Sequence, residues 1–259
     1  MRIISLNGNG IRACVKKGMV RWWESTDADL LLFQEVRYDD FEAIDNLFSE
    51  YWVSLFSAIK KGYSGVLAIA KKPPLNVVLG MGESKWDDEA RVMLLEYSGV
   101  VIVNAYFPSG ALSNKRQSYK LEFLKAFKAY IDDLGKRYLN IIIAADWNIC
   151  HREIDIHDPK RLSGKPGFTR EERSWLDSLE KEGWKDAFRI FNSDPKNFTW
   201  WSYQSDSRER NVGWRIDGFW LSPSASKTAK LCIHLDDMKL SDHCPVLLEW
   251  GLPITFTSN

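Results

Sequence analysis

The stretch N-I-I-I-A-A-D-W-N occupies residues 140–148 and shows the pattern that decides the fold. A run of apolar residues rich in β-branched side chains is typical of a buried strand, and this run ends directly on Asp146 and Asn148. Similar runs recur at residues 2–6, 30–34, 65–70, 100–107, 215–221 and 245–250. The sequence therefore predicts a strand-rich α/β protein in which several strands end on polar side chains.

Helical patterns are fewer than strand patterns. Apolar residues three or four positions apart predict helices within residues 41–48 and 123–134. A third helix is indicated by Thr169 and Glu172, which have the spacing of a capping box, and by Gly183 as a stop. We expect helices to cover two sheets, with the chemistry placed in the loops that follow the strands.

Length and composition favour a single domain. The chain has 259 residues, 45% of them hydrophobic, and no linker or repeat divides it. It lacks a signal-peptide pattern and any apolar run of the ~18 residues that a membrane span needs. We therefore expect one domain over residues 1–259, which acts as a cytoplasmic monomer without a membrane partner.

Charge and cysteine content exclude some classes of site. The formal net charge is +0, so any site for a polyanion must be local rather than a property of the whole chain. The four cysteines are far apart and form no C-x-x-C pair, which excludes a zinc-finger spacing and a redox dithiol. We expect reduced thiols.

The polar residues at the predicted strand ends have the chemistry of a hard-cation site. Carboxylate and amide oxygens, without clustered Cys or several His, favour Mg²⁺ or Mn²⁺ over zinc. Each of these residues alone could be a turn former, a helix cap or a packing residue, but burying so many acids together requires compensating charge. They are Asn7, Asn9, Glu35, Tyr106, Asp146, Asn148, Asp217, Asp242 and His243.

Short segments along the chain also carry a family resemblance. They are S-L-N-G-N-G at residues 5–10, L-F-Q-E-V at 32–36, G-Y-S-G-V at 62–66, Y-F-P-S-G at 106–110, A-D-W-N at 145–148, R-N-V-G-W-R-I-D at 210–217 and S-D-H-C-P at 241–245. In this order they resemble the exonuclease III type of AP endonuclease, within the endonuclease/exonuclease/phosphatase superfamily. R-E-I-D-I at 152–156 and G-F-T-R-E-E-R at 167–173 narrow the resemblance to the DNA-repair branch.

The resemblance implies a four-layer α/β sandwich, in which helices flank two packed, mainly antiparallel sheets and the site lies at one edge. It implies that Glu35 binds Mg²⁺, with help from Asn7 and Asp242, and that Mn²⁺ can substitute for Mg²⁺. Asp146 would orient or deprotonate the attacking water, and Asn148 would position it.

The remaining catalytic roles concern the scissile phosphate. By the same resemblance, His243 paired with Asp217 would contact this phosphate, and Tyr106 would donate another hydrogen bond. Phosphodiester hydrolysis needs an in-line water, a base and positive charge on the phosphate oxygens, so these residue types suit the reaction. A carboxylate bonded to an imidazole also favours its charged form.

Residues 198–214 combine aromatic and basic side chains. In the family, matching aromatics form a pocket for a flipped-out abasic sugar, which excludes a normal nucleotide by size. The alternative is ordinary packing of a loop, as we expect for Trp201. The candidates for substrate contacts are Asn9, Ser109, Lys165, Trp200, Arg208, Arg210, Trp214 and Ile216.

Five positions depart from the family pattern. They are Leu6 in place of Trp, Gly8 in place of Val, Arg37 in place of Lys, Ser109 in place of Asn and Gly218 in place of Tyr. None removes a catalytic group. The change at Ser109 bears on substrate preference, because its hydroxyl reaches less far toward a phosphate than an Asn amide.

The resemblance implies a nuclease that hydrolyses the phosphodiester 5′ to abasic sites in double-stranded DNA. It would also have 3′-phosphodiesterase, 3′-phosphatase and 3′→5′ exonuclease activity on blocked 3′ ends, and would associate with the nucleoid. Three alternatives stay open: a 3′-end-processing enzyme with little abasic-site incision, a hydrolase of small phosphoesters, and a DNA-binding relative without catalysis.

Overall fold

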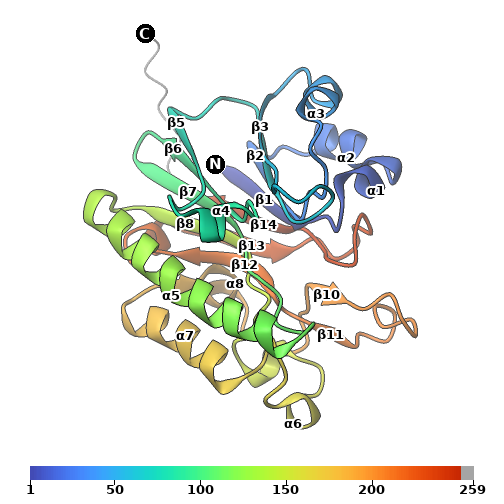
Figure 1. The fold of residues 1–259 in the computed structure, drawn as a ribbon, viewed down its shortest axis with the longest axis vertical. Helices are drawn as coiled ribbons and strands as arrows, with labels where there is room; N and C mark the ends of the chain where they lie inside the picture. Colours follow the sequence, from blue (N-terminus) through green and yellow to red (C-terminus); the bar gives the residue numbers. More distant parts are fainter. Residues whose placement is uncertain (252–259) are drawn as a thin grey trace.

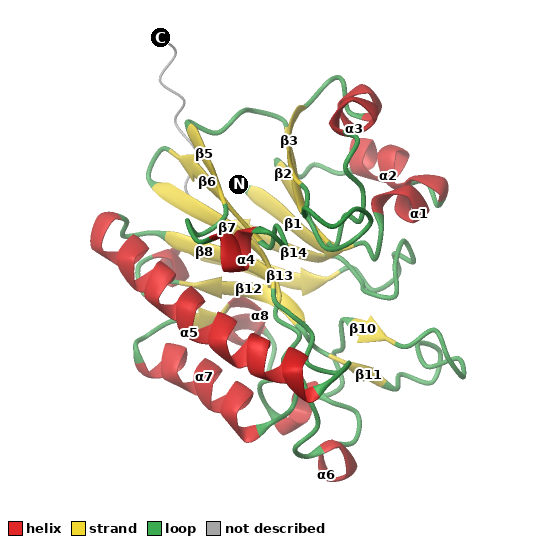
Figure 2. Cartoon of the chain, in the orientation of Figure 1, coloured by secondary structure: helices red, strands yellow, loops and turns green. Residues whose placement is uncertain are grey.

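A computed structural model describes residues 1–251 of the chain, and the remaining residues of the tail lie outside the described part. Two six-stranded sheets form its centre (Figures 1 and 2). The first sheet has the order β13 (Ala229–His234), β14 (Val246–Trp250), β1 (Arg2–Asn7), β2 (Leu30–Gln34), β4 (Val66–Ala70), β3 (Trp52–Phe56). The second has the order β5 (Asn76–Leu79), β6 (Val92–Tyr97), β7 (Val100–Tyr106), β8 (Ile141–Asp146), β12 (Asp217–Leu221), β9 (Lys185–Asp186).

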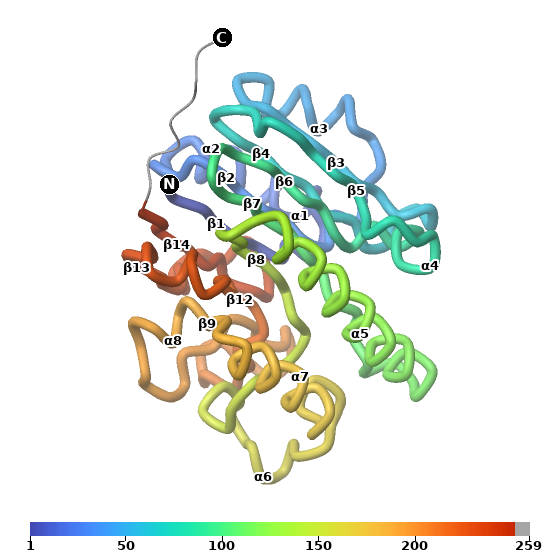
Figure 3. The backbone as a smooth tube through the Cα atoms, turned by 90° about the vertical axis from the view of Figure 1, so that its left-hand side faces the viewer, coloured from blue at the N-terminus to red at the C-terminus, as the bar shows by residue number. Residues whose placement is uncertain are grey.

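The helices cover the outer faces of these sheets, so four layers form. The first sheet is covered by α1 (Ile11–Lys16), α2 (Met19–Ser25) and α3 (Phe41–Leu47), and the second by α5 (Asn114–Arg137) and α7 (Arg170–Lys181). Figure 3 shows α3 well separated from α5 and α7. Shorter helices are α4 (Ser84–Asp87), α6 (Pro159–Leu162) and α8 (Ala187–Phe191).

Alternate residues of each central strand supply two different cores. Leu30 and Leu32 of β2 pack between the sheets, whereas Leu31 and Phe33 pack under α1–α3. In β8, likewise, Ile142 faces the inner core and its neighbours pack under α5 and α7. Because both faces are covered, these strands are continuously apolar rather than alternating. Each fully buried Leu or Ile stabilises the fold by about 1.5–3 kcal/mol.

The predicted four-layer sandwich is confirmed, and so are all seven predicted strands, with small shifts at their ends. Each sheet contains one parallel pair, β1–β2 or β7–β8, and its other pairs are antiparallel. The capping box is also present: Glu172 N donates to Thr169 Oγ1 at 3.2 Å, and Thr169 N donates to Glu172 Oε2 at 2.9 Å. Gly183 follows α7 with a φ of 92°.

This topology brings several strand ends to one edge. Asn7 at the end of β1 pairs with Gln34 of β2, and Asp146 at the end of β8 pairs with both Tyr106 of β7 and Asp217 of β12. A short hairpin, β10 (Trp200–Trp201) with β11 (Gly213–Trp214), stands beside this edge (Figure 1). Within residues 1–251, no helix has the length and apolar character needed to cross a membrane.

Candidate active site

A fully buried amide joins two carboxylates at the sheet edge. Asn7 Nδ2 donates to Glu35 Oε2 at 3.0 Å and to Asp146 Oδ2 at 2.7 Å. Its Oδ1 accepts the backbone N–H of Asn9 at 2.9 Å. Asn7 therefore lies behind the carboxylates and sets the distance between them.

The backbone around these carboxylates adopts an unusual conformation. Four residues have φ between 48° and 59°, a left-handed region that residues other than glycine rarely occupy. They are Asn9, Glu35, Arg37 and Asn148. Such strain persists only where surrounding structure holds it, and it is concentrated at functional sites. Here the left-handed conformation lies just after strand ends, and the side chains of Asn9, Glu35 and Asn148 line a common cavity. Glu35 also pairs with Arg37, one of the positions that depart from the family pattern.

Asp146 is buried among hydrogen-bond donors. Besides Asn7, it accepts the backbone N–H of Asn148 at 2.8 Å and Asn148 Nδ2 at 3.1 Å. Burial, followed by the negative charge of Asp217, raises the pKa of Asp146 to about 7, although His243 opposes the shift. A carboxylate with such a pKa exchanges a proton readily near neutral pH, as a general base must.

His243 and Asp217 form a buried ion pair. His243 Nδ1 lies 2.9 Å from Asp217 Oδ2, and the two residues are 5% and 3% exposed. Burial lowers the pKa of His243, but the charge of Asp217 and its hydrogen bond outweigh this effect and raise the pKa to about 10. The ring is therefore an imidazolium at neutral pH, and its Nε2–H is available on the pocket side.

Thr199 was not singled out by the sequence, yet it holds Asp217 in place. Its hydroxyl donates to Asp217 Oδ2 at 2.7 Å, and its Oγ1 accepts the backbone N–H groups of Ile216 and Asp217 at 3.0 Å each. Thr199 is fully buried. Nothing in its local sequence distinguishes it from a strand residue, because its partners lie 17 and 18 positions away.

Asp242 precedes His243 and accepts several hydrogen bonds. Its donors are Asn9 Nδ2 at 3.1 Å, Trp200 Nε1 at 3.0 Å and the hydroxyl of Ser241 at 3.0 Å. Burial would raise the pKa of Asp242, but the charge of His243 and these bonds lower it overall. Asp242 is thus an anion that fastens the Trp200 hairpin to the sheet edge.

Tyr106 lies above a buried guanidinium. Arg91 donates to the Tyr106 carbonyl at 3.0 Å, and its Cζ lies 4.5 Å from the centre of the tyrosine ring. Burial, and then the charge of Glu35, raises the pKa of the Tyr106 hydroxyl well above 10. The hydroxyl therefore stays protonated and acts as a hydrogen-bond donor. Arg91, which the sequence did not single out, fixes its position.

The polar side chains of the site and an aromatic wall line one cavity of about 330 Å³. Trp200 and Trp214 pair across β10–β11, with ring centres 6.2 Å apart and planes at 83°. Ile216 forms the inner end of this wall and is 7% exposed. The lining residues are Asn9, Glu35, Tyr106, Ser109, Ala111, Asp146, Asn148, Pro166, Gly167, Trp200, Trp214, Ile216, Asp242 and His243.

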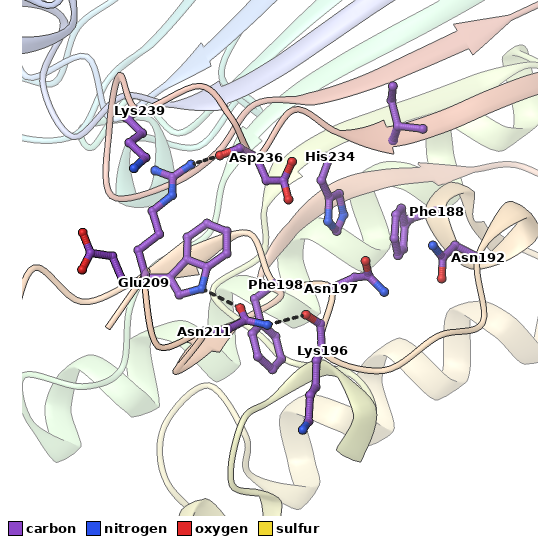
Figure 4. Close-up of a pocket in the computed structure, with 13 residues that line it drawn as sticks. Phe188, Asn192, Lys196, Asn197, Phe198, Glu209, Asn211, His234, Asp236 and Lys239 are labelled. Carbon is purple, nitrogen blue, oxygen red and sulfur yellow. Dashed lines mark hydrogen bonds between the residues drawn. The ribbon is translucent and has the colours of Figure 1, made fainter. Parts of the chain in front are cut away.

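The other candidate residues lie outside this cavity. Asn7 and Asp217 support it from behind, whereas Lys165 and Arg210 are exposed on neighbouring loops. Arg208 lines a second cavity, whose wall also includes Asn211, His234 and Asp236 (Figure 4).

In that second cavity, the Arg208 guanidinium donates to the backbone carbonyls of Asp236, Met238 and Ser241 and stacks on Trp201, 4.6 Å from the ring centre. Arg208 therefore anchors the hairpin. Trp201 packs, as the sequence analysis expected, and is 5% exposed.

One departure from the family pattern has a direct structural reason. A Cβ on Gly8 would lie 1.7 Å from the nearest atom of the Phe33 ring, so the ring occupies the space that a valine would need. No similar obstacle exists at Gly218, where the nearest atom to an added Cβ is 4.0 Å away.

The donor set fits a hard divalent cation. Glu35, Asp146 and Asp242 line the cavity, and with Asp217 behind them these four carboxylates outnumber the two cations that pair with them, His243 and Arg37. The ligand atoms of Asp146, Asp217 and His243 lie within 4.8 Å of one another, but Asp217 and His243 already pair with each other. Glu35 and Asp242 are therefore the better ligands for an ion facing the cavity, and Asp146 beside them is left free to act on water.

Sequence comparison agrees with this arrangement. Residues 4–243 match the Endonuclease/Exonuclease/phosphatase family. The chain belongs to this family. The resemblance to the exonuclease III type is confirmed, and so is the prediction of an enzyme, because the Endonuclease/Exonuclease/phosphatase family is a family of hydrolases and the curated relatives are nucleases.

Individual members of the Endonuclease/Exonuclease/phosphatase family align over nearly the whole chain. An exodeoxyribonuclease of Bacillus subtilis (strain 168) is 35% identical over 250 residues, which cover 96% of this chain and 98% of that protein. DNA repair nuclease APEX1 of Danio rerio is 35% identical over 261 residues, covering 96% and 81%. Among solved structures, a 3'-5' exonuclease from Neisseria meningitidis superposes with a TM-score of 0.89 at 25% identity, covering 97% and 100%.

Proposed function

We propose that the protein is a Mg²⁺-dependent DNA-repair nuclease that hydrolyses the phosphodiester 5′ to abasic sites in double-stranded DNA, as a monomer associated with the nucleoid. One observation carries the proposal: a single cavity holds both the residues suited to phosphodiester hydrolysis and an aromatic wall. The first group is Glu35, Asp146 and His243, and the wall is formed by Trp200 and Trp214. The names of the relatives as DNA-repair nucleases support the same substrate.

The residues divide the chemistry among them. Asp146, with a pKa of about 7, accepts a proton from the attacking water, and Asn148 orients this water. The imidazolium of His243 and the hydroxyl of Tyr106 donate to the phosphate oxygens, where negative charge increases in the transition state. Mg²⁺ held by Glu35 and Asp242 would supply Lewis-acid stabilisation of the same charge.

The aromatic wall accounts for the choice of lesion. A deoxyribose without a base presents a small, largely apolar surface, and Trp200, Trp214 and Ile216 offer a matching apolar corner. A normal nucleotide would have to fit its base into the same space. An abasic residue also unstacks at lower cost, which adds to the selectivity.

A second candidate is a 3′-end-processing exonuclease and phosphatase with little abasic-site incision. The likeness to the Neisseria 3'-5' exonuclease favours it. In addition, Ser109 lies on the cavity wall with a side chain that reaches less far than the family's Asn. Both candidates share the metal and phosphate chemistry and differ in the DNA that they position.

One experiment separates these candidates. A labelled duplex with a single abasic-site analogue, a duplex with a recessed 3′-phosphate and an undamaged duplex are incubated with enzyme in Mg²⁺, in Mn²⁺ or in EDTA. Incision 5′ to the lesion faster than end trimming is the expected result. Fast removal of the 3′-phosphate with little incision would instead establish the second candidate.

Variants test the assigned chemistry. Glu35→Gln should lower Mg²⁺-dependent cleavage by at least about a hundredfold, since it removes a charge used in the transition state. Glu122→Gln is the matched control, because Glu122 is an exposed carboxylate paired with Lys85, outside the cavity. Wild-type enzyme that cleaves none of the three duplexes in either metal would refute the proposal.

A further inference from the structure

Two fully buried charges lie between α5 and α7, behind the wall of the active-site cavity. Lys120 Nζ of α5 lies 2.6 Å from Glu172 Oε1 of α7, and both side chains have no exposed surface. None of the catalytic roles described above uses this pair. Within residues 1–251, Lys120 is the one lysine that is buried.

The pair directs its remaining hydrogen bonds to the backbone of the cavity wall. Lys120 Nζ donates to the carbonyl of Asn148 at 2.7 Å. The carboxylate of Glu172 accepts the N–H of Gly167, at 2.8 Å to Oε2, and the N–H of Thr169. Asn148 and Gly167 both line the cavity, so one ion pair is bonded to two of its walls.

Asn148 needs such a restraint. Its φ of 50° lies in the left-handed region, which Asn adopts more readily than most residues but which local hydrogen bonds must still select. Both hydrogens of its side-chain amide are in use, by the Phe107 carbonyl at 3.0 Å and by Asp146 Oδ2 at 3.1 Å. The position of the Asn148 backbone therefore determines where its Oδ1 and the Asp146 carboxylate lie.

Gly167 transmits the same restraint to the aromatic wall. A Cβ at this position would lie 3.0 Å from the Trp214 ring and 3.1 Å from the Asn148 carbonyl, so the space between these two groups has no room for a side chain at residue 167. Cys150 N also donates to the Gly167 carbonyl at 2.8 Å. A displacement of Gly167 would change the distance between Trp214 and Asn148.

Stability alone does not explain why this pair is charged. Desolvating two ions largely cancels their attraction, and apolar residues of equal volume often stabilise a core at least as well. What apolar residues lack is the ability to bond the Asn148 carbonyl and the Gly167 N–H. The structural consequence of the charges is therefore the position of these two backbone groups.

We propose that Lys120 and Glu172 are positioning residues, which fix the backbones of Asn148 and Gly167 relative to each other in the cavity wall. They thereby set kcat and the preference for an abasic sugar. The proposal rests on the proposed nuclease function. It requires no contact of either residue with substrate. A shift of about 1 Å in a reacting geometry lowers a rate on the order of a hundredfold, so a small relaxation has a measurable effect.

The test compares three variants at a temperature well below unfolding. Lys120→Met/Glu172→Met removes both charges together, so neither is left buried alone. Glu172→Asp keeps the charge pair but shortens the reach to Gly167, and it provides a second reading if the double variant fails to fold. Lys128→Met is the matched control, because Lys128 also links α5 to the end of α7, through Glu182 at 3.0 Å, without touching the cavity.

We expect kcat for abasic-site incision to fall about ten- to a hundredfold in the double variant and less in Glu172→Asp. The ratio of abasic-site incision to trimming of undamaged ends should fall with it, whereas Lys128→Met stays within twofold of wild type in both. A purely structural role would lower Tm but leave kcat per folded molecule and this ratio unchanged. Either folded variant with wild-type kcat and wild-type ratio would overturn the proposal.

A spectroscopic reading separates this proposal from the proposed function. In ¹⁵N-labelled protein, the side-chain amide resonances of Asn148 should shift in the double variant and not in Lys128→Met, whether or not the enzyme cleaves abasic DNA. Unshifted resonances would count against the positioning role even in an active nuclease. Inactive wild-type enzyme with shifted resonances would refute only the substrate assignment.

Discussion

Replacing Asp217 with Asn tests whether one buried carboxylate keeps His243 charged. The substitution removes the negative charge but preserves the shape of the side chain and an oxygen that accepts a hydrogen bond. Asp217 Oδ2 lies 2.9 Å from His243 Nδ1 in a region closed to solvent. The matched control is Asp177→Asn, because Asp177 also bonds a buried histidine, His151, at 2.8 Å and outside the cavity.

The size of the effect follows from the pKa of His243. Burial lowers this pKa, but the charge of Asp217 leads the opposing interactions that raise it from 6.5 to about 10. Since each pKa unit corresponds to about 1.4 kcal/mol, the site favours the imidazolium by roughly 5 kcal/mol. In the variant, burial still lowers the pKa of His243, and only the weaker charge interactions with Asp146 and Asp242 raise it. We therefore expect the pKa of His243 to fall below about 7.

The assay is incision of the abasic duplex by both enzymes from pH 6 to pH 9. At pH 8 the variant should lose about 10²–10³-fold in kcat, the usual effect of removing one charged donor from a transition state. The ratio of variant to wild type should recover toward pH 6, where a neutral imidazole gains its proton. NMR titration of the His243 ring should show the lowered pKa directly.

The same ion pair also makes a prediction for stability. A raised pKa means that the contribution of the pair to the free energy of unfolding is complete below about pH 6.5 and is lost as pH rises toward 10. Urea denaturation should therefore show the stability difference between wild type and Asp217→Asn shrinking over this range. A rate ratio independent of pH, or a His243 pKa still near 10 in the variant, would refute the reasoning.

Three further predictions concern the cavity wall, a buried charge cluster and the thiols. Trp214→Ala should lower the preference for abasic over undamaged DNA by about tenfold, equal to about 1.4 kcal/mol, and an unchanged ratio in paired kinetic assays would contradict the assigned wall. Asp155→Asn leaves the buried guanidinium of Arg215 and the half-buried one of Arg189 without a full counter-charge, so urea denaturation should show a loss of about 3–5 kcal/mol. Burial would raise the pKa of Asp155, but the two guanidinium groups hold it far below its ordinary value. The contribution of Asp155 to the free energy of unfolding is therefore present above about pH 4 and is lost as pH falls. A stability difference between wild type and Asp155→Asn that does not change with pH would contradict this reasoning. Burial raises the pKa of every cysteine thiol, that of Cys14 to about 12. A thiol reagent at pH 8 should therefore react slowly with the folded enzyme, whereas in urea it should label all four thiols. Fast labelling of the folded enzyme would show that a thiol is exposed.

Local patterns in the sequence were enough to predict the main elements. The central strands are long apolar runs because both of their faces are covered, and α7 begins where Thr169 and Glu172 cap it. The strands β5 and β13 escaped prediction because exposed residues interrupt their apolar runs. The strand β6 was also missed, although its apolar run is buried. The catalytic residue types came from motifs whose spacing is local, and most of them line one cavity.

The sequence by itself thus determined the strands, the caps and which polar residues end the strands, because each depends on neighbours a few positions away. Only the tertiary structure decided how these residues act on one another. Asp217 and His243 are 26 positions apart, and Lys120 and Glu172 are 52 apart, yet each pair becomes one buried unit. Arg208 anchors the hairpin through carbonyls about 30 positions away, which no local pattern indicates. The physical reason is that charge, burial and hydrogen bonding depend on distance in space, which the packing of the two sheets sets.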